Sequence, residues 1–197
     1  MSGRLTLHFF SRLFLGVFLA WFLTGAHVAG KDQSTGGAIY LPLIVTASSA
    51  HEPNAQEQQI AELLHNESGQ QRPYLHYSVI LSTIARQRCA DMAQRGYMSH
   101  TNPDGQGPNY LVRQAGYVLP AYYSQALDAN NIESIAAGQA TATQTWAAWL
   151  GSPAHRTHVL GTDPFYAAQV DYGVGYVYKA DSPYGHYWVV ITAQPGP

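Results

Sequence analysis

The sequence predicts an α+β domain in which helices pack on a small, mostly antiparallel β-sheet. Two observations carry this prediction. Helical periodicity and helix-capping residues recur between positions 55 and 160, whereas β-branched and aromatic residues concentrate in two runs near the end of the chain. Helices that come first and strands that come last are typical of an α+β domain.

The first two helices are predicted from apolar positions at helical spacing. Residues 55–67 carry a modest apolar stripe and form the first helix. The second begins after Ser78, a good N-cap, and ends before Gly96, a residue type favoured just beyond a helix. Asn102-Pro103-Asp104-Gly105 then predicts a tight turn.

Three further helices and two strands complete the predicted order. The helices are expected at residues 110–115, 138–150 and 152–160, with the Ser152 hydroxyl capping the last. The strands are expected at residues 170–178 and 187–193, and the turn-forming residues between them predict a hairpin.

Length, charge and cysteine content limit how the chain can be organised and what it can bind. Its 197 residues suit a leader and one domain, and the formal net charge of −2 gives no basic field that would indicate a nucleic-acid partner. Cys89 is the single cysteine, so no intrachain disulfide can form. We expect a leader at 1–30, a flexible linker at 31–53 and the folded domain at 54–197.

The N-terminus is typical of an export signal. Arg4 and Arg12 precede a nearly pure apolar run at residues 13–23, and small residues follow it. The alternative is an uncleaved anchor through residues 13–30, which would be the chain's only attachment to a membrane. Either way the sequence predicts a secreted or surface-held domain.

Five motifs in a fixed order resemble the CAP superfamily, which includes cysteine-rich secretory proteins, venom allergens and plant pathogenesis-related proteins. In sequence order they are the helix around Leu81-Ala85-Cys89, Tyr97-Met98-Ser99-His100, Glu133-Ser134-Ile135-Ala136, Trp149-Leu150-Gly151-Ser152-Pro153-Ala154-His155-Arg156, and Tyr172-Gly173-Val174-Gly175. The resemblance covers about residues 55–194. It implies an α-β-α sandwich with three or four strands, in which two histidines line a shared cleft.

The chain departs from the family pattern at several positions. Many members place two histidines and two glutamates in the cleft, and His100, Glu133 and His155 match three of these. Ser152 stands where the second carboxylate would fall, and Ser134 replaces the usual asparagine. The disulfides of eukaryotic members are absent, so the chain resembles the bacterial branch.

The candidate site is therefore a cleft built from His100, Glu133, Ser152 and His155. His100 and His155 are candidate ligands of one divalent metal ion, zinc above all, with positions left open for water. Glu133 would orient a histidine or polarise a water molecule. The structural alternative is that both imidazoles and the carboxylate hydrogen-bond to backbone and fix loops.

Other residues carry weaker hypotheses. A nucleophilic Ser152 paired with His155 lacks the elbow sequence of serine hydrolases, and His158 three positions after His155 is a weak metal motif. Asp104 is expected near the cleft as a turn residue. Cys89 on an apolar helix face is expected in the core.

The favoured function is extracellular binding of a small apolar ligand or a cell-surface partner, with a metal ion held by the histidines. Sterol and lipid binding enter through the resemblance alone. One alternative is a zinc-dependent hydrolase with Glu133 as general base, although catalytic zinc usually has three protein ligands. Another is an envelope scaffold with a vestigial cleft. Catalysis and oligomeric state stay open.

Overall fold

The computed structural model describes residues 52–197. The predicted leader at residues 1–30, and the predicted linker up to residue 51, lie outside this range. Within residues 52–197, no helix combines the length and apolar character needed to cross a membrane.

A four-stranded sheet forms the centre of the described domain. Its strands are β1 (His76–Tyr77), β2 (Glu133–Ala137), β3 (Asp171–Tyr178) and β4 (His186–Ala193), and their order across the sheet is β1-β3-β4-β2. The β3–β4 hairpin and the β2–β4 pair are antiparallel, whereas β1 runs parallel to β3. The predicted α+β class and mostly antiparallel sheet are thus confirmed.

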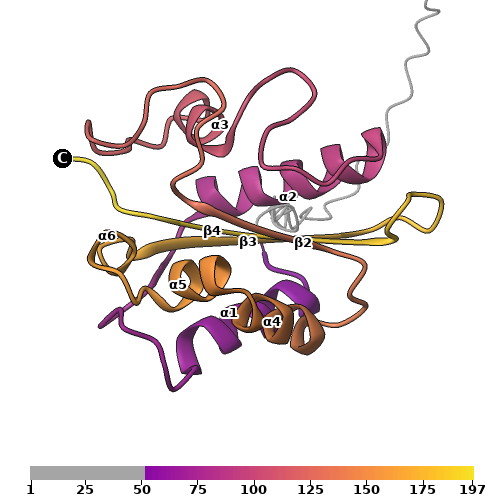
Figure 1. Ribbon diagram of the computed structural model, residues 1–197, viewed down its shortest axis with the longest axis horizontal. Coiled ribbons are helices and arrows are strands. Elements are labelled where there is room, and N and C mark those ends of the chain that lie inside the picture. Colours follow the sequence, from indigo (N-terminus) through magenta and orange to yellow (C-terminus); the bar gives the residue numbers. More distant parts are fainter. Residues whose placement is uncertain (1–51) are drawn as a thin grey trace, which may run out of the picture. The chain divides into compact units, whose positions relative to one another are not determined.

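Helices cover both faces of this sheet (Figure 1). On one face lie α2 (Val79–Arg95) and α3 (Pro108–Gln114). On the other lie α1 (Ala55–Asn66), α4 (Ala142–Gly151) and α5 (Pro153–Leu160), and the four-residue α6 (Pro164–Ala167) follows α5. The arrangement is a three-layer α-β-α sandwich, as the family resemblance implies.

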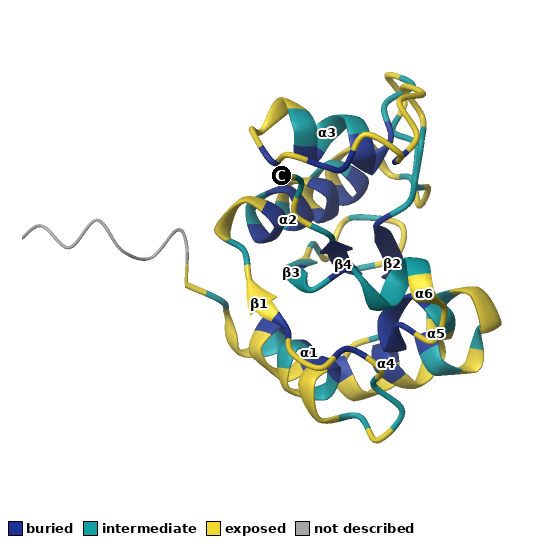
Figure 2. Ribbon diagram, turned by 90° about the vertical axis from the view of Figure 1, so that its left-hand side faces the viewer, coloured by how far each residue is buried: buried dark blue, intermediate teal, exposed yellow. Residues whose placement is uncertain are grey.

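Strand β4 contributes side chains to the hydrophobic clusters on both faces of the sheet. Tyr187, Val189 and Ile191 belong to the cluster beneath α2, whereas Trp188 and Val190 belong to the cluster beneath α1 and α4. Successive side chains of a strand point to opposite faces, so a strand covered on both sides must be apolar throughout. Figure 2 shows the resulting buried residues on the helix surfaces that face the sheet.

The helix boundaries of α2 agree with the capping residues. The Ser78 side chain accepts a hydrogen bond from the Leu81 backbone nitrogen, and Gly96 ends the helix in the left-handed conformation at φ 70°. Helix α1 begins with a capping box in which Asn54 and Glu57 satisfy each other's backbone N–H groups. Helix α1 therefore begins at Ala55, where the sequence predicts it.

Three local predictions need correction. The helix expected from Gly138 begins only at Ala142, because β2 occupies the preceding residues and Gly138 turns the chain at φ 95°. Ser152 does precede α5, but its hydroxyl makes no capping hydrogen bond. Helix α3 starts two residues earlier than residue 110, because Pro108 supplies a suitable first turn.

The Gly173-Val174-Gly175 segment of β3 lies directly against the backbone of α2. A Cβ atom placed on Gly175 would lie 2.3 Å from the carbonyl carbon of Ala85, and one on Gly173 would lie 2.2 Å from the backbone nitrogen of Ser82. Only glycine allows the helix and strand to approach this closely. This requirement gives the Gly-Val-Gly motif a physical cause.

We expect Gly175→Ala to destabilise the domain by about 2 kcal/mol, because the added methyl group must push rigid backbone apart. Urea unfolding of the purified protein would measure the loss. Gly151→Ala is the matched control, since a Cβ at Gly151 meets nothing within 4 Å. Equal unfolding midpoints for both variants would contradict the close-packing account.

Candidate functional site

Three of the four predicted cleft residues meet at a small cavity of about 120 Å³. Side chains from β2, α5, α6 and the preceding loops form its wall. They belong to His100, Asn130, Asn131, Ile132, Glu133, Ser134, Ala154, His155, His158 and Tyr166. The structure thus brings together His100, Glu133 and His155, which lie far apart in the sequence.

Glu133 is the buried anchor of this cavity. It is the first residue of β2, where it pairs with Ile191, and the Asn130 side chain accepts a hydrogen bond from its backbone nitrogen. Its side chain is fully buried, and its Oε2 lies 3.0 Å from Nε of Arg88. A buried carboxylate needs such a partner, because removing an unpaired charge from water is costly.

Arg88 links this carboxylate to the loop that carries His100. Its Nη2 donates to the backbone oxygens of Ser99 (2.6 Å) and His100 (2.9 Å), and its Nη1 donates to the Tyr97 hydroxyl. Burial lowers the pKa of Arg88, but the charge of Glu133 together with the hydrogen bonds to Glu133 and Tyr97 outweighs this and leaves the pKa raised. The guanidinium therefore stays charged and ties α2, the loop and β2 together.

The His100 ring is oriented by Glu133. Its Nδ1 lies 2.9 Å from Glu133 Oε1, and its side chain is 37% exposed. An ionised carboxylate can only accept, so Nδ1 carries the hydrogen. In the neutral ring, Nε2 then holds the free lone pair. A carboxylate that fixes the tautomer in this way is the usual support of a metal-binding histidine.

His155 lies in the first turn of α5 and is half-buried. Within residues 52–197, its ring has no hydrogen-bond partner from the protein, so both ring nitrogens are available for a ligand. Burial, and then the positive charge of a protonated His100, lower the pKa of His155. Both imidazoles line the same cavity. A neutral imidazole is the form that binds metal.

Ser134 and His158 are two cavity residues to which sequence analysis assigns little or no role. Ser134 Oγ lies 2.6 Å from His158 Nδ1, and His158 Nε2 lies 2.8 Å from Thr192 Oγ1. Both ring nitrogens of His158 are therefore occupied by protein. The weak His-x-x-His hypothesis fails on this point, because His158 has no free nitrogen for a metal.

Three other predicted residues lie elsewhere. Ser152 sits at the junction of α4 and α5 and is not among the residues that line the cavity. Asp104 is exposed and pairs with Arg95 at 2.6 Å, which holds the pKa of that carboxyl below its usual range. Cys89 is buried, donates to the Gly175 carbonyl oxygen and packs in the core as expected.

Arg88 is the functional residue that sequence reasoning missed. A signal for it exists: Arg88 follows Ala85 by three positions and precedes Met92 by four, so it lies on the apolar face of α2. An arginine on a buried helix face requires an acidic partner. Asp91 and Glu133 are both in its network, Asp91 through the Tyr97 hydroxyl.

The donor set fits a metal ion held by two protein ligands. His100 Nε2 and the His155 ring offer two imidazole nitrogens on one cavity, and water would complete the coordination shell. In the described part of the chain, no three His, Cys, Asp or Glu side chains gather as a metal-binding group. Glu133 supports His100 and is not itself a free ligand, because Arg88 and His100 engage its two oxygens.

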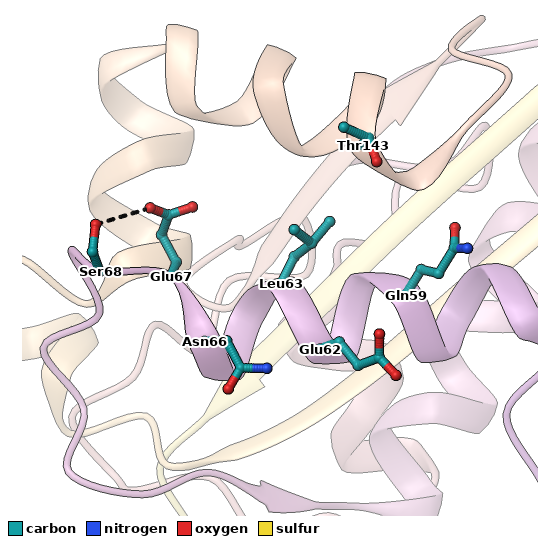
Figure 3. A pocket seen from close by; sticks show the side chains of 7 residues that line it. All are labelled: Gln59, Glu62, Leu63, Asn66, Glu67, Ser68 and Thr143. Carbon is teal, nitrogen blue, oxygen red and sulfur yellow. Dashed lines mark hydrogen bonds between the residues drawn. The ribbon is translucent and has the colours of Figure 1, made fainter.

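Larger hollows lie away from these residues. One of about 610 Å³ runs between α1 and α4 and is lined mainly by polar side chains, among them Gln59, Glu62 and Asn66 (Figure 3). Another of about 720 Å³ lies beside β1. If volume alone decided, these two hollows would be the candidate sites. The histidine cavity is the candidate site because a buried carboxylate, Glu133, orients His100 there, and His155 lines the same cavity.

Comparison with known proteins shows which family this chain belongs to. The model of the cysteine-rich secretory protein family (CAP) matches residues 64–192. The uncharacterized protein YkwD of Bacillus subtilis (strain 168) is 29% identical over 154 residues, which make up 76% of this chain and 54% of that protein. The chain therefore spans about half the length of this relative.

Two solved structures share the fold. An extracellular protein of Bacillus anthracis (strain Ames) that contains an SCP domain superposes with a TM-score of 0.53 at 24% identity, over 71% of this chain and 40% of that one. An outer surface protein of Borrelia burgdorferi gives a TM-score of 0.51 at 19% identity, over 71% of this chain and 89% of that one.

Proposed function

Because the chain belongs to the cysteine-rich secretory protein (CAP) family, we propose that it is an extracellular binding protein whose histidine cavity holds one divalent metal ion. The family name, the names of the two structural relatives and the predicted leader at residues 1–30 support an extracellular location. The observation that carries the metal proposal is the Glu133–His100 hydrogen bond, which leaves Nε2 of His100 as a free acceptor.

His100 and His155 are the proposed ligands, and zinc is the proposed ion because imidazole suits it and water molecules can complete the shell. The bound ion would supply a positive charge able to hold an anionic or carbonyl group of a partner. Glu133 orients His100, and the ion pair with Arg88 holds the Glu133 carboxylate in place. In this proposal Glu133 and Arg88 hold the metal-binding histidine in place, and neither of them transfers a proton.

The geometry does not favour Glu133 as a general base. A general base must reach the proton that it removes, and both Glu133 oxygens are already engaged by Arg88 and His100. The carboxylate is also fully buried. We therefore prefer binding to the zinc-dependent hydrolase as the proposed function.

The predicted apolar ligand does not fit the same cavity. Sites for drug-sized ligands have volumes of roughly 300–1,000 Å³, against about 120 Å³ here. An apolar ligand would suit the hollow of about 720 Å³ beside β1, whose wall includes Ala61, Val79 and Tyr172. The metal proposal does not depend on that second ligand.

Zinc titration by calorimetry on the full chain tests the metal proposal. We expect one ion to bind per chain at micromolar or tighter affinity, and we expect His100→Ala and His155→Ala each to abolish this binding, because each removes half of the protein ligands. His65→Ala, which changes an exposed histidine on α1, is the control and should bind normally. No binding by the wild-type protein, or full binding by the two cavity variants, would overturn the proposal.

A further inference from the structure

A buried chain of polar side chains runs behind the histidine cavity. It joins Ser134, His158, Thr192 and Gln169, and Arg72 contacts it from the side. All five residues are at least 95% buried. In such a dry environment every hydrogen must be placed so that each donor meets an acceptor, which allows the proton positions to be worked out.

Gln169 sets the direction of the chain. Its Nε2 lies 2.8 Å from the backbone oxygen of Asn131, which can only accept, so the amide nitrogen must be on that side. Its Oε1 therefore faces Thr192 Oγ1 at 2.7 Å and accepts the threonine proton.

Thr192 then fixes the tautomer of His158. The hydroxyl has one proton, which goes to Gln169, and its oxygen also accepts from Arg72 Nη2 at 3.2 Å. His158 Nε2, 2.8 Å from the same oxygen, can satisfy the contact only by donating to it. The hydrogen of the neutral His158 ring is therefore on Nε2, and Nδ1 holds the lone pair.

Ser134 must consequently donate its proton to His158 Nδ1, at 2.6 Å. The His158 ring stays neutral because it is buried and lies beside Arg72, and both effects lower its pKa well below the usual value. The same surroundings argue against Ser134 as a nucleophile. Its proton would have to create an imidazolium next to Arg72, and no carboxylate contacts His158 among residues 52–197.

The hydroxyl oxygen of Ser134 keeps its lone pairs, and Ser134 lines the cavity with His100 and His155. We infer that Ser134 is a further binding determinant of this site: its oxygen accepts a hydrogen bond from a water molecule bound to the metal. This inference rests on the proposed function. His100 Nε2 and Ser134 Oγ both present acceptors to the cavity, and such a wall suits a cation surrounded by water.

Zinc titration of Ser134→Ala in the full chain tests the inference. We expect about a tenfold loss of affinity, the effect typical of losing an outer-shell partner. Ser134→Thr keeps the hydroxyl and should restore binding close to the wild-type level. Ser82→Ala is the matched control, because Ser82 is also a fully buried serine but accepts from the Val174 backbone nitrogen, outside the cavity wall.

The outcomes separate this inference from the proposed function. Unfolding midpoints measured without metal would show that each variant is folded. Wild-type affinity in Ser134→Ala, together with lost binding in His100→Ala, would overturn the role of Ser134 and leave the metal site intact. Equal weakening in Ser134→Ala and Ser134→Thr would also overturn it, since the hydroxyl would then not matter. Absence of zinc binding in the wild-type protein would overturn both.

Discussion

Replacing Arg88 with methionine is expected to destabilise the domain by about 3–5 kcal/mol, the usual cost of leaving one partner of a buried ion pair alone. Both side chains of the Arg88–Glu133 pair are at least 98% buried. The substitution also leaves the Ser99 and His100 carbonyl oxygens without their donor. We therefore expect the His100 loop to lose order together with the core.

Urea unfolding at neutral pH would measure this loss. Arg95→Met is the matched control, because Arg95 lies on the same helix but pairs with Asp104 at the surface, where an ion pair contributes little. The double variant Arg88→Met with Glu133→Gln should recover part of the loss, since no unpaired charge stays buried. If the Arg88→Met variant unfolded at the same urea concentration as the Arg95→Met variant, this result would contradict the account.

The domain is also expected to lose stability in mild acid. Burial, then Arg72, then the neighbouring His155 and His100, lower the pKa of His158 well below its usual value in the folded state. The unfolded state therefore binds a proton that the folded state excludes once the pH falls below about 6.5. Stability is fully present above that pH and falls by about 1.4 kcal/mol for each pH unit below it.

Unfolding midpoints at a series of pH values from neutral to mildly acidic, with chelator present, would check this slope. His158→Gln should lower stability at neutral pH, because the hydrogen-bond chain is broken, but should flatten the acid slope. The residual slope would come from His155, whose pKa is lowered in the same direction. His65→Gln should keep the wild-type slope, and a wild-type protein equally stable across the series would contradict the prediction.

The sequence predicts elements well where the signals are local. Ser78 and Gly96 bound α2 because capping depends on residues within one turn, and β3 and β4 follow from dense runs of β-forming residues. Strand β2 escapes prediction for a physical reason. It is short, covered on both faces and begins with the charged Glu133, so neither alternation nor a long apolar run marks it.

The candidate site could be predicted in part. Family resemblance brings His100, Glu133 and His155 to one cleft, and the structure places them on one cavity. The pairing of these residues could not be predicted: Arg88 stands out on the apolar face of α2, but no local pattern joins it to Glu133, 45 positions away, or joins Ser134 to His158, 24 positions away. Tertiary pairing of polar residues leaves no periodic trace in a single sequence.

Anomalous X-ray scattering from a zinc-soaked crystal would test the central claim most directly. We predict one strong zinc peak in the cavity, within coordination distance of His100 Nε2 and a ring nitrogen of His155, with water as the remaining ligands. His100 Nδ1 should keep its hydrogen bond to Glu133. A cavity without a zinc peak, or a peak bound only by surface residues, would contradict the account.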